Sequence, residues 1–172
     1  MNTDNITIRR MRIDELDDIQ ALYAEQIKCD DNPLTAIRIP PKQHAWEMRR
    51  LRQQLITNQR YIACVALDEQ TNVQNGAPKF VGYVAAILET QAHLFEVESF
   101  ASIEELWVLP DYRGRGIGQA LMETLFCALD DLGISWVTTR FPESAKDIHE
   151  FFKKIGFEQK TLEMQLHISP TD

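Results

Sequence analysis

The chain has 172 residues, of which 44% are hydrophobic and 26% charged, a composition typical of one globular domain with its own core. We therefore expect a single domain over residues 1–172. Its net charge of −8 argues against nucleic acid or an anionic membrane as the main partner, because both select for clustered lysine and arginine. An acidic chain instead suits a soluble enzyme and would weakly attract a cationic substrate.

Cysteine and histidine usage predicts neither a disulfide framework nor a metal site. Cys29, Cys64 and Cys127 are odd in number and widely spaced, and the four histidines lack metal-ligand spacing. We expect the cysteines to be buried, Cys127 on the core face of a helix with Leu125. No charged-then-apolar leader and no run of about 18 apolar residues is present, so the expected location is the cytoplasm.

Hydrophobic periodicity predicts the elements of the first half of the chain. The segment 6–9 alternates as a strand, and 14–27 has helical spacing. A second helix is expected over 43–57. Two strands at 61–67 and 79–88, joined by a polar connection, are expected to form an antiparallel hairpin.

The helix predicted over 43–57 carries both apolar and basic residues. We expect Arg49, Arg50 and Arg52 to lie on its solvent-exposed face. Its broad apolar face is formed by Trp46, Met48, Leu51, Leu55 and Ile56.

The second half of the chain alternates strands and helices. Strands are predicted over 102–109, 134–139 and 161–168, and helices over 119–132 and 144–155. Glycines follow both helices, as expected of helix ends.

The segment 113–118 reads Arg-Gly-Arg-Gly-Ile-Gly and joins a predicted strand to a predicted helix. Glycine lets a ligand approach main-chain amides, and the N-terminus of a helix attracts anions, so this loop suits a phosphorylated ligand. A dinucleotide fingerprint would need glycine at Gln119 or Leu121, and a nucleoside triphosphate loop would need Lys at Gln119. The hypothesis of a nucleotide-dependent oxidoreductase or kinase is therefore supported by the glycines alone.

The loop resembles motif A of the GCN5-related N-acetyltransferases, Arg/Gln-x-x-Gly-x-Gly/Ala, at Arg113, Gly116 and Gly118. The predicted order of elements and the helix-end sequence Ile155-Gly156-Phe157 are similar to that family as well. The resemblance implies an α/β (α+β) fold with a mixed central sheet flanked by helices. Two parallel strands of this sheet would splay apart and enclose coenzyme A.

The resemblance also implies which residues bind acetyl-coenzyme A (acetyl-CoA). Amides of the glycine loop would hold its pyrophosphate, and main-chain groups of the preceding strand would pair with pantetheine and polarise the thioester carbonyl. The residues concerned are Leu106, Trp107, Val108, Arg113, Gly114, Arg115, Gly116, Ile117, Gly118 and Gln119.

Glu104 and Glu105 are adjacent in a predicted strand, where glutamate is disfavoured. Consecutive strand residues point to opposite faces, so at least one carboxylate is expected on a covered face or in a cleft. The segment is similar to the acidic strand of small-amine acetyltransferases. By position, this resemblance makes Glu104 the candidate base and Glu105 a candidate for binding the amine.

Phe152 departs from the family pattern, which has a tyrosine there as proposed general acid. Tyr83 and Tyr112 are possible substitutes. The sequence thus predicts an N-acetyltransferase that transfers acetyl directly to a primary amine of a small molecule or peptide in a ternary complex. The alternative is a catalytically weak acyl-CoA-binding sensor, and homodimerisation is common among such proteins.

Overall fold

The computed structural model describes residues 5–28, 41–72, 78–90, 99–141 and 143–160. The chain divides into two compact units, Met1–Arg140 and Phe141–Asp172, and each is described by itself. The predicted strand at 161–168 lies outside the described residues.

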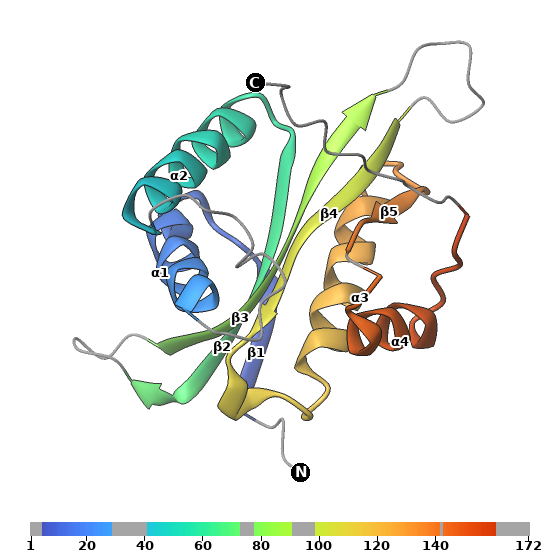
Figure 1. Cartoon of the computed structure of the whole chain (residues 1–172). Helices are drawn as coiled ribbons and strands as arrows, with labels where there is room; N and C mark the ends of the chain where they lie inside the picture. The colour runs from blue at the N-terminus through green and yellow to red at the C-terminus, as the bar shows by residue number, and fades with distance from the viewer. Residues whose placement is uncertain (1–4, 29–40, 73–77, 91–98, 142, 161–172) are drawn as a thin grey trace, which may run out of the picture. The chain divides into compact units, whose positions relative to one another are not determined.

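The first unit is built on a five-stranded mixed sheet with strand order β1-β2-β3-β4-β5 (Figure 1). The strands β1 to β4 pair antiparallel, and β4 pairs parallel with β5. Their bounds are Ile6–Arg10, Tyr61–Asn72, Pro78–Thr90, Ser99–Val108 and Val137–Thr139. The expected hairpin of β2 and β3 and the expected parallel pair are therefore both confirmed.

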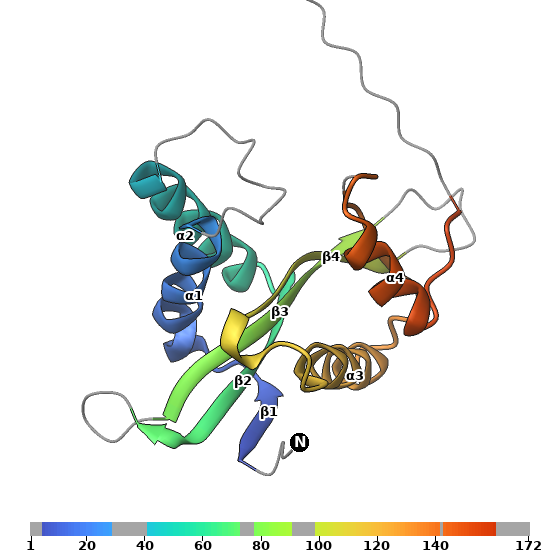
Figure 2. The same ribbon diagram turned by 60° about the horizontal axis from the view of Figure 1, so that its bottom comes forward.

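Helices cover both faces of this sheet. The short helix η1 (Ile13–Glu15) precedes α1 (Leu16–Lys28), and α2 (Pro41–Thr57) follows. Figure 2 shows α1 and α2 on one face, and α3 (Ile117–Asp130) on the other, where it contacts strands β1 to β4. A second short helix, η3 (Pro110–Tyr112), leads from β4 towards α3.

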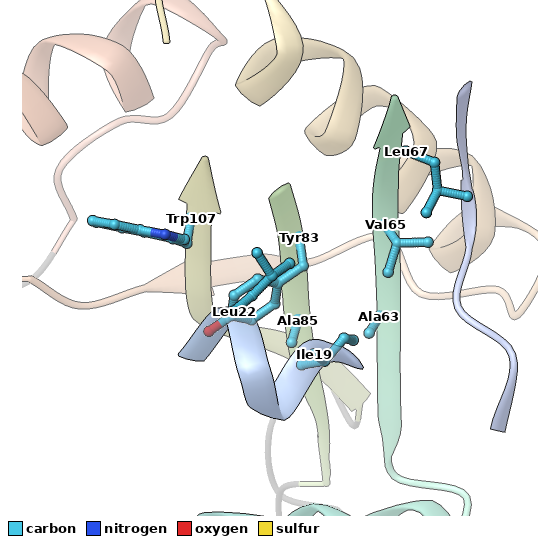
Figure 3. Packing of buried hydrophobic residues seen from close by; sticks show 8 residues of the cluster. All are labelled: Ile19, Leu22, Ala63, Val65, Leu67, Tyr83, Ala85 and Trp107. Atoms are coloured by element: carbon cyan, nitrogen blue, oxygen red, sulfur yellow. The ribbon is translucent and has the colours of Figure 1, made fainter. Parts of the chain in front are cut away.

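Alternate residues of three strands form the core under α1. Figure 3 shows Ile19 and Leu22 of α1 beside inward-facing residues of β2, β3 and β4. Burial of one such aliphatic side chain contributes about 1.5–3 kcal/mol. The strand residues of this cluster are Ala63, Val65, Leu67, Tyr83, Ala85 and Trp107.

The second unit contains α4 (Lys146–Lys154) and a small aromatic cluster. Phe152 is 5% exposed, and its ring centroid lies 5.5 Å from that of Phe141, 5.4 Å from Phe151 and 5.0 Å from Phe157. The position where a hydroxyl would be expected from the family pattern is thus the centre of an apolar cluster.

Three expectations about burial were wrong. Cys127 is exposed, because it points away from the buried stripe that contains Leu125. Trp46 and Leu51 are exposed on α2, whereas Arg52 is almost fully buried. The apolar face of α2 is therefore narrower than expected and includes an arginine.

Candidate active site

A β-bulge separates the two adjacent glutamates on β4. Glu105 lies opposite Ala85 of β3, and Ile103 lies opposite the next residue, Ala86, so Glu104 is the extra residue. Such a bulge reorients a side chain and bends the strand. The pairing with β5 ends here as well, because β5 reaches only Ala101 to Ile103. Within the described part of the chain, β4 extends beyond the end of its parallel neighbour.

The glycine loop leads into α3, as the sequence predicted, but the short helix η3 separates it from the end of β4. Gly114 and Gly116 have φ values of +72° and +80°, in the left-handed region that favours glycine. Hydrogen bonding within α3 starts at Ala120, whose amide donates to the Gly116 carbonyl at 3.0 Å. The preceding amides, of Ile117 to Gln119, therefore have no acceptor within the helix.

The two loop arginines lie over aromatic rings. The guanidinium carbon of Arg113 is 4.4 Å from the centroid of the Trp107 ring, and its Nε donates to the Val108 carbonyl at 3.0 Å. Arg115 lies 5.1 Å from the centroid of the Tyr112 ring. Both side chains are exposed, so their charges face the solvent next to the loop.

Tyr112 anchors the start of the loop to the β2 strand. Its hydroxyl donates to Oδ2 of Asp68 at 2.8 Å, and Thr71 donates to the same carboxylate. The Nζ of Lys79 lies 5.3 Å from the Tyr112 ring centroid. Lys79 was not among the site residues predicted from the sequence. Only the tertiary fold brings Asp68 and Tyr112 together, because they are 44 residues apart.

The two candidate carboxylates have different surroundings. Glu104 is exposed, and its Oε1 accepts a hydrogen bond from the Ser102 hydroxyl. Glu105 is buried and lies opposite Ala85, which belongs to the core cluster under α1. Its carboxylate accepts bonds from Nη2 of Arg52 at 2.6 and 2.7 Å.

Arg52 is the residue of this region that the sequence analysis placed incorrectly. Its side chain is 1% exposed, its Nη1 donates to Oε1 of Gln20 at 2.7 Å, and its guanidinium lies 4.5 Å from the Tyr23 ring centroid. Burial acts most strongly and lowers the pKa of Arg52, but the Glu105 carboxylate with two nearby tyrosines outweighs it, so the net pKa is raised. A signal was available: Arg52 follows Met48 by four residues and precedes Leu55 by three, which places it on the apolar stripe.

The hydroxyls of the two candidate substitute acids already bind protein acceptors. Tyr83 is buried and donates to Oε1 of Gln26 at 2.8 Å. Burial and the Glu105 charge raise its pKa well above the ordinary value. Tyr112 donates to Asp68, and burial and this bond raise its pKa as well.

No helix within the described residues is long and apolar enough to cross a membrane. In the same part of the chain, no three acidic, histidine or cysteine side chains gather as a metal site would require.

Similarity to solved structures supports the fold. An aminoglycoside N-acetyltransferase AAC(6')-Iy in complex with CoA is 14% identical, with a TM-score of 0.70, over 95% of this chain and 94% of that chain. An aminoglycoside 6'-N-acetyltransferase AAC(6')-Ih from Acinetobacter baumannii has a TM-score of 0.66 at 17% identity, over 95% of this chain and 99% of that chain.

Sequence comparison identifies the family. An uncharacterized N-acetyltransferase, MJ1207 of Methanocaldococcus jannaschii, is 30% identical over 154 residues, which are 90% of this chain. The matched segment spans only 61% of that relative's length. The model of the acetyltransferase (GNAT) domain matches residues 59–159, more than half of the chain. With its glycine loop at the start of α3 and the parallel pairing of β4 with β5, the chain belongs to the GNAT acetyltransferase family.

Proposed function

We propose that this protein is an acetyl-CoA-dependent N-acetyltransferase that acts on a primary amine of a small molecule or peptide. The proposal rests mainly on the glycine loop at the N-terminus of α3 and on the strand β4, which extends beyond the end of its parallel neighbour β5. The direct-transfer mechanism and a single catalytic domain over residues 1–172 are parts of the same proposal.

The loop suits the phosphates of acetyl-CoA. A Cβ built on Gly114 or Gly116 would meet no atom within 4 Å, so there is open space in front of their main chain. The amides of Ile117, Gly118 and Gln119, at the positive end of the helix dipole, would bind the pyrophosphate. Arg113 and Arg115 would add positive charge, as a polyanionic ligand requires.

The β4 main chain suits the remainder of acetyl-CoA, which supplies the acetyl thioester when bound. Within the described residues, Leu106 to Val108 lie beyond the last β5 residue paired with β4, Thr139. We propose that main-chain groups of this segment pair with pantetheine and polarise the thioester carbonyl.

The amine has to lose a proton to react. Glu104 is the proposed base, because its carboxylate is exposed at the bulge and oriented by the Ser102 hydroxyl. Glu105, whose carboxylate is paired with Arg52, is the proposed amine-binding residue on the acceptor side.

A second function, an acyl-CoA sensor with little turnover, is favoured by Phe152. That side chain lies in an apolar cluster and has no proton to give a departing thiolate. In an enzyme, the thiolate can instead leave into water or take a proton from the product ammonium. A sensor would need neither route.

Replacement of the proposed base discriminates between the two functions. Glu104→Gln is expected to lower kcat by about 100-fold or more, because it keeps the shape of the side chain and removes the proton acceptor. Calorimetric titration with CoA should give nearly the same affinity as for the parent protein. The enzyme proposal fails if the parent releases no thiol with any amine, or if the variant turns over as fast as the parent.

A further inference from the structure

The buried pair of Arg52 and Glu105 connects three elements next to the bulge. Arg52 comes from α2, its carboxylate partner lies on β4, and Gln20 on α1 accepts from the same guanidinium. Glu105 directly follows the bulged residue, Glu104. Any displacement of the Glu105 side chain would therefore move the segment of strand that carries the proposed base.

This pair is poorly suited to a purely stabilising role. Nε of Arg52 and Nε2 of Gln20 are buried and have no hydrogen-bond partner within the described residues. The free-energy cost of removing two charges from water offsets most of the attraction between them. The unpaired donors add to that cost. Apolar side chains of similar size would serve stability equally well, which points to a role in the reaction.

We propose that Arg52 is a positioning residue that holds the Glu105 carboxylate, and through it the bulge at Glu104, in the geometry that acetyl transfer requires. This inference rests on the proposed function. Arg52 itself does not contact the reacting atoms in this scheme. Its effect passes through Glu105 and the strand.

The groups that face Glu105 allow the pair to be tested by pH. Besides Arg52, they are the hydroxyls of Tyr23 on α1, Tyr61 on β2 and Tyr83 on β3. Burial first, and then the Glu105 charge, raises the pKa of Tyr23 to about 12 and raises those of the other two as well. The tyrosines therefore stay neutral between about pH 6 and pH 9. A new ionisation that appears in this range when Arg52 is removed belongs to the orphaned carboxylate.

The primary experiment compares Arg52→Met, Arg52→Lys and the control Arg49→Met by steady-state kinetics and thermal unfolding. Arg49 lies on the same helix, but it is exposed and pairs with the exposed Asp17 at 2.8 Å. We expect Arg52→Met to lower kcat by roughly 10- to 100-fold, the scale of a displaced catalytic group, with little change in the KM for acetyl-CoA. Arg52→Lys should recover part of kcat because it keeps the charge, and Arg49→Met should match the parent.

The pH dependence of kcat gives the second readout. In Arg52→Met a buried carboxylate without a counterion takes up a proton, so the profile should gain an ionisation that is absent from the parent. The double variant Arg52→Met/Glu105→Gln has no such carboxylate and should lack this ionisation, whatever its rate. The double variant is also expected to fold, because it leaves no unpaired charge in the core.

Two results would overturn the inference while the parent remains active. One is a folded Arg52→Met variant with the kcat and pH profile of the parent, which would make Arg52 merely structural. The other is an unchanged kcat with an increase only in the KM for the amine, which would limit the effect of Arg52 to acceptor binding. If the parent transfers no acetyl group, the proposed function fails first, and the role assigned to Arg52 is overturned with it.

Discussion

A single carboxylate, Asp68, links the sheet to the start of the glycine loop. Hydrogen bonds from Thr71 and then from Tyr112 lower its pKa to about 2, against a smaller opposing effect of burial. An aspartate in an unfolded chain titrates near pH 3.9. Because the folded-state pKa is the lower one, this contribution to stability is complete above about pH 5 and is lost as the pH falls towards 2.

Asp68→Asn should therefore flatten the acid limb of the stability curve. Between about pH 5 and pH 2, the unfolding free energy of the variant should fall less steeply than that of the parent, as followed by urea unfolding at each pH. Tyr112→Phe removes one of the hydrogen bonds and should give an intermediate slope. Equal slopes for the parent and Asp68→Asn would show that the carboxylate is not held in this way.

At the scale of one element, α3 carries a left-handed glycine at each end. Gly116 precedes the helix with φ +80°, and Gly133 follows it with φ +72°; a Cβ at either would meet nothing within 4 Å. Alanine at either position should cost about 1–2 kcal/mol of unfolding free energy, because the left-handed conformation is strained for a residue with a Cβ. The two substitutions thus apply the same strain at opposite ends of one helix.

Only one of the two should affect ligand binding. Gly116→Ala is expected to weaken CoA binding in a calorimetric titration, since the amides around it are the proposed phosphate ligands. Gly133→Ala should leave the affinity as it is in the parent. If both variants bind CoA with equal affinity, the phosphates do not bind at this loop.

The elements were largely predictable, because their signals are local. Strand alternation, helical spacing and glycine positions place β1 to β4, both helices before the hairpin and α3 within a few residues. β5 is shorter than expected and begins at Val137, since only its end pairs with β4. The bulge at Glu104 was not predictable, because it depends on the register of β4 against β3.

The candidate site was predictable only in part. The glycine loop follows from spacing within six residues. The buried state of Arg52 depends on a carboxylate 53 residues away, and three neighbouring arginines on a helix ordinarily indicate a solvated face. Cys127 was misplaced by a simpler error, since a residue two positions from Leu125 lies on the opposite side of a helix.

At the scale of the whole molecule, the net charge of −8 bears on the acceptor. If the acidic exterior steers a cationic amine, kcat/KM for that amine should fall as salt rises from about 0.01 to about 1 M, where the screening length shrinks from about 30 to about 3 Å. A neutral amine of similar size should show no such trend. Parallel salt dependences for the two amines would remove the argument for a cationic acceptor.

Acetyl transfer by this chain is tested most directly by the release of free thiol from acetyl-CoA. Purified protein would be assayed with polyamines, aminoglycosides, amino acids and peptides, with a calorimetric titration of CoA alongside. We predict thiol release above the amine-free background with one acceptor class, which would also identify that class. CoA binding without turnover on any amine would contradict acetyl transfer and favour a sensor, with Phe152 as the first residue to examine.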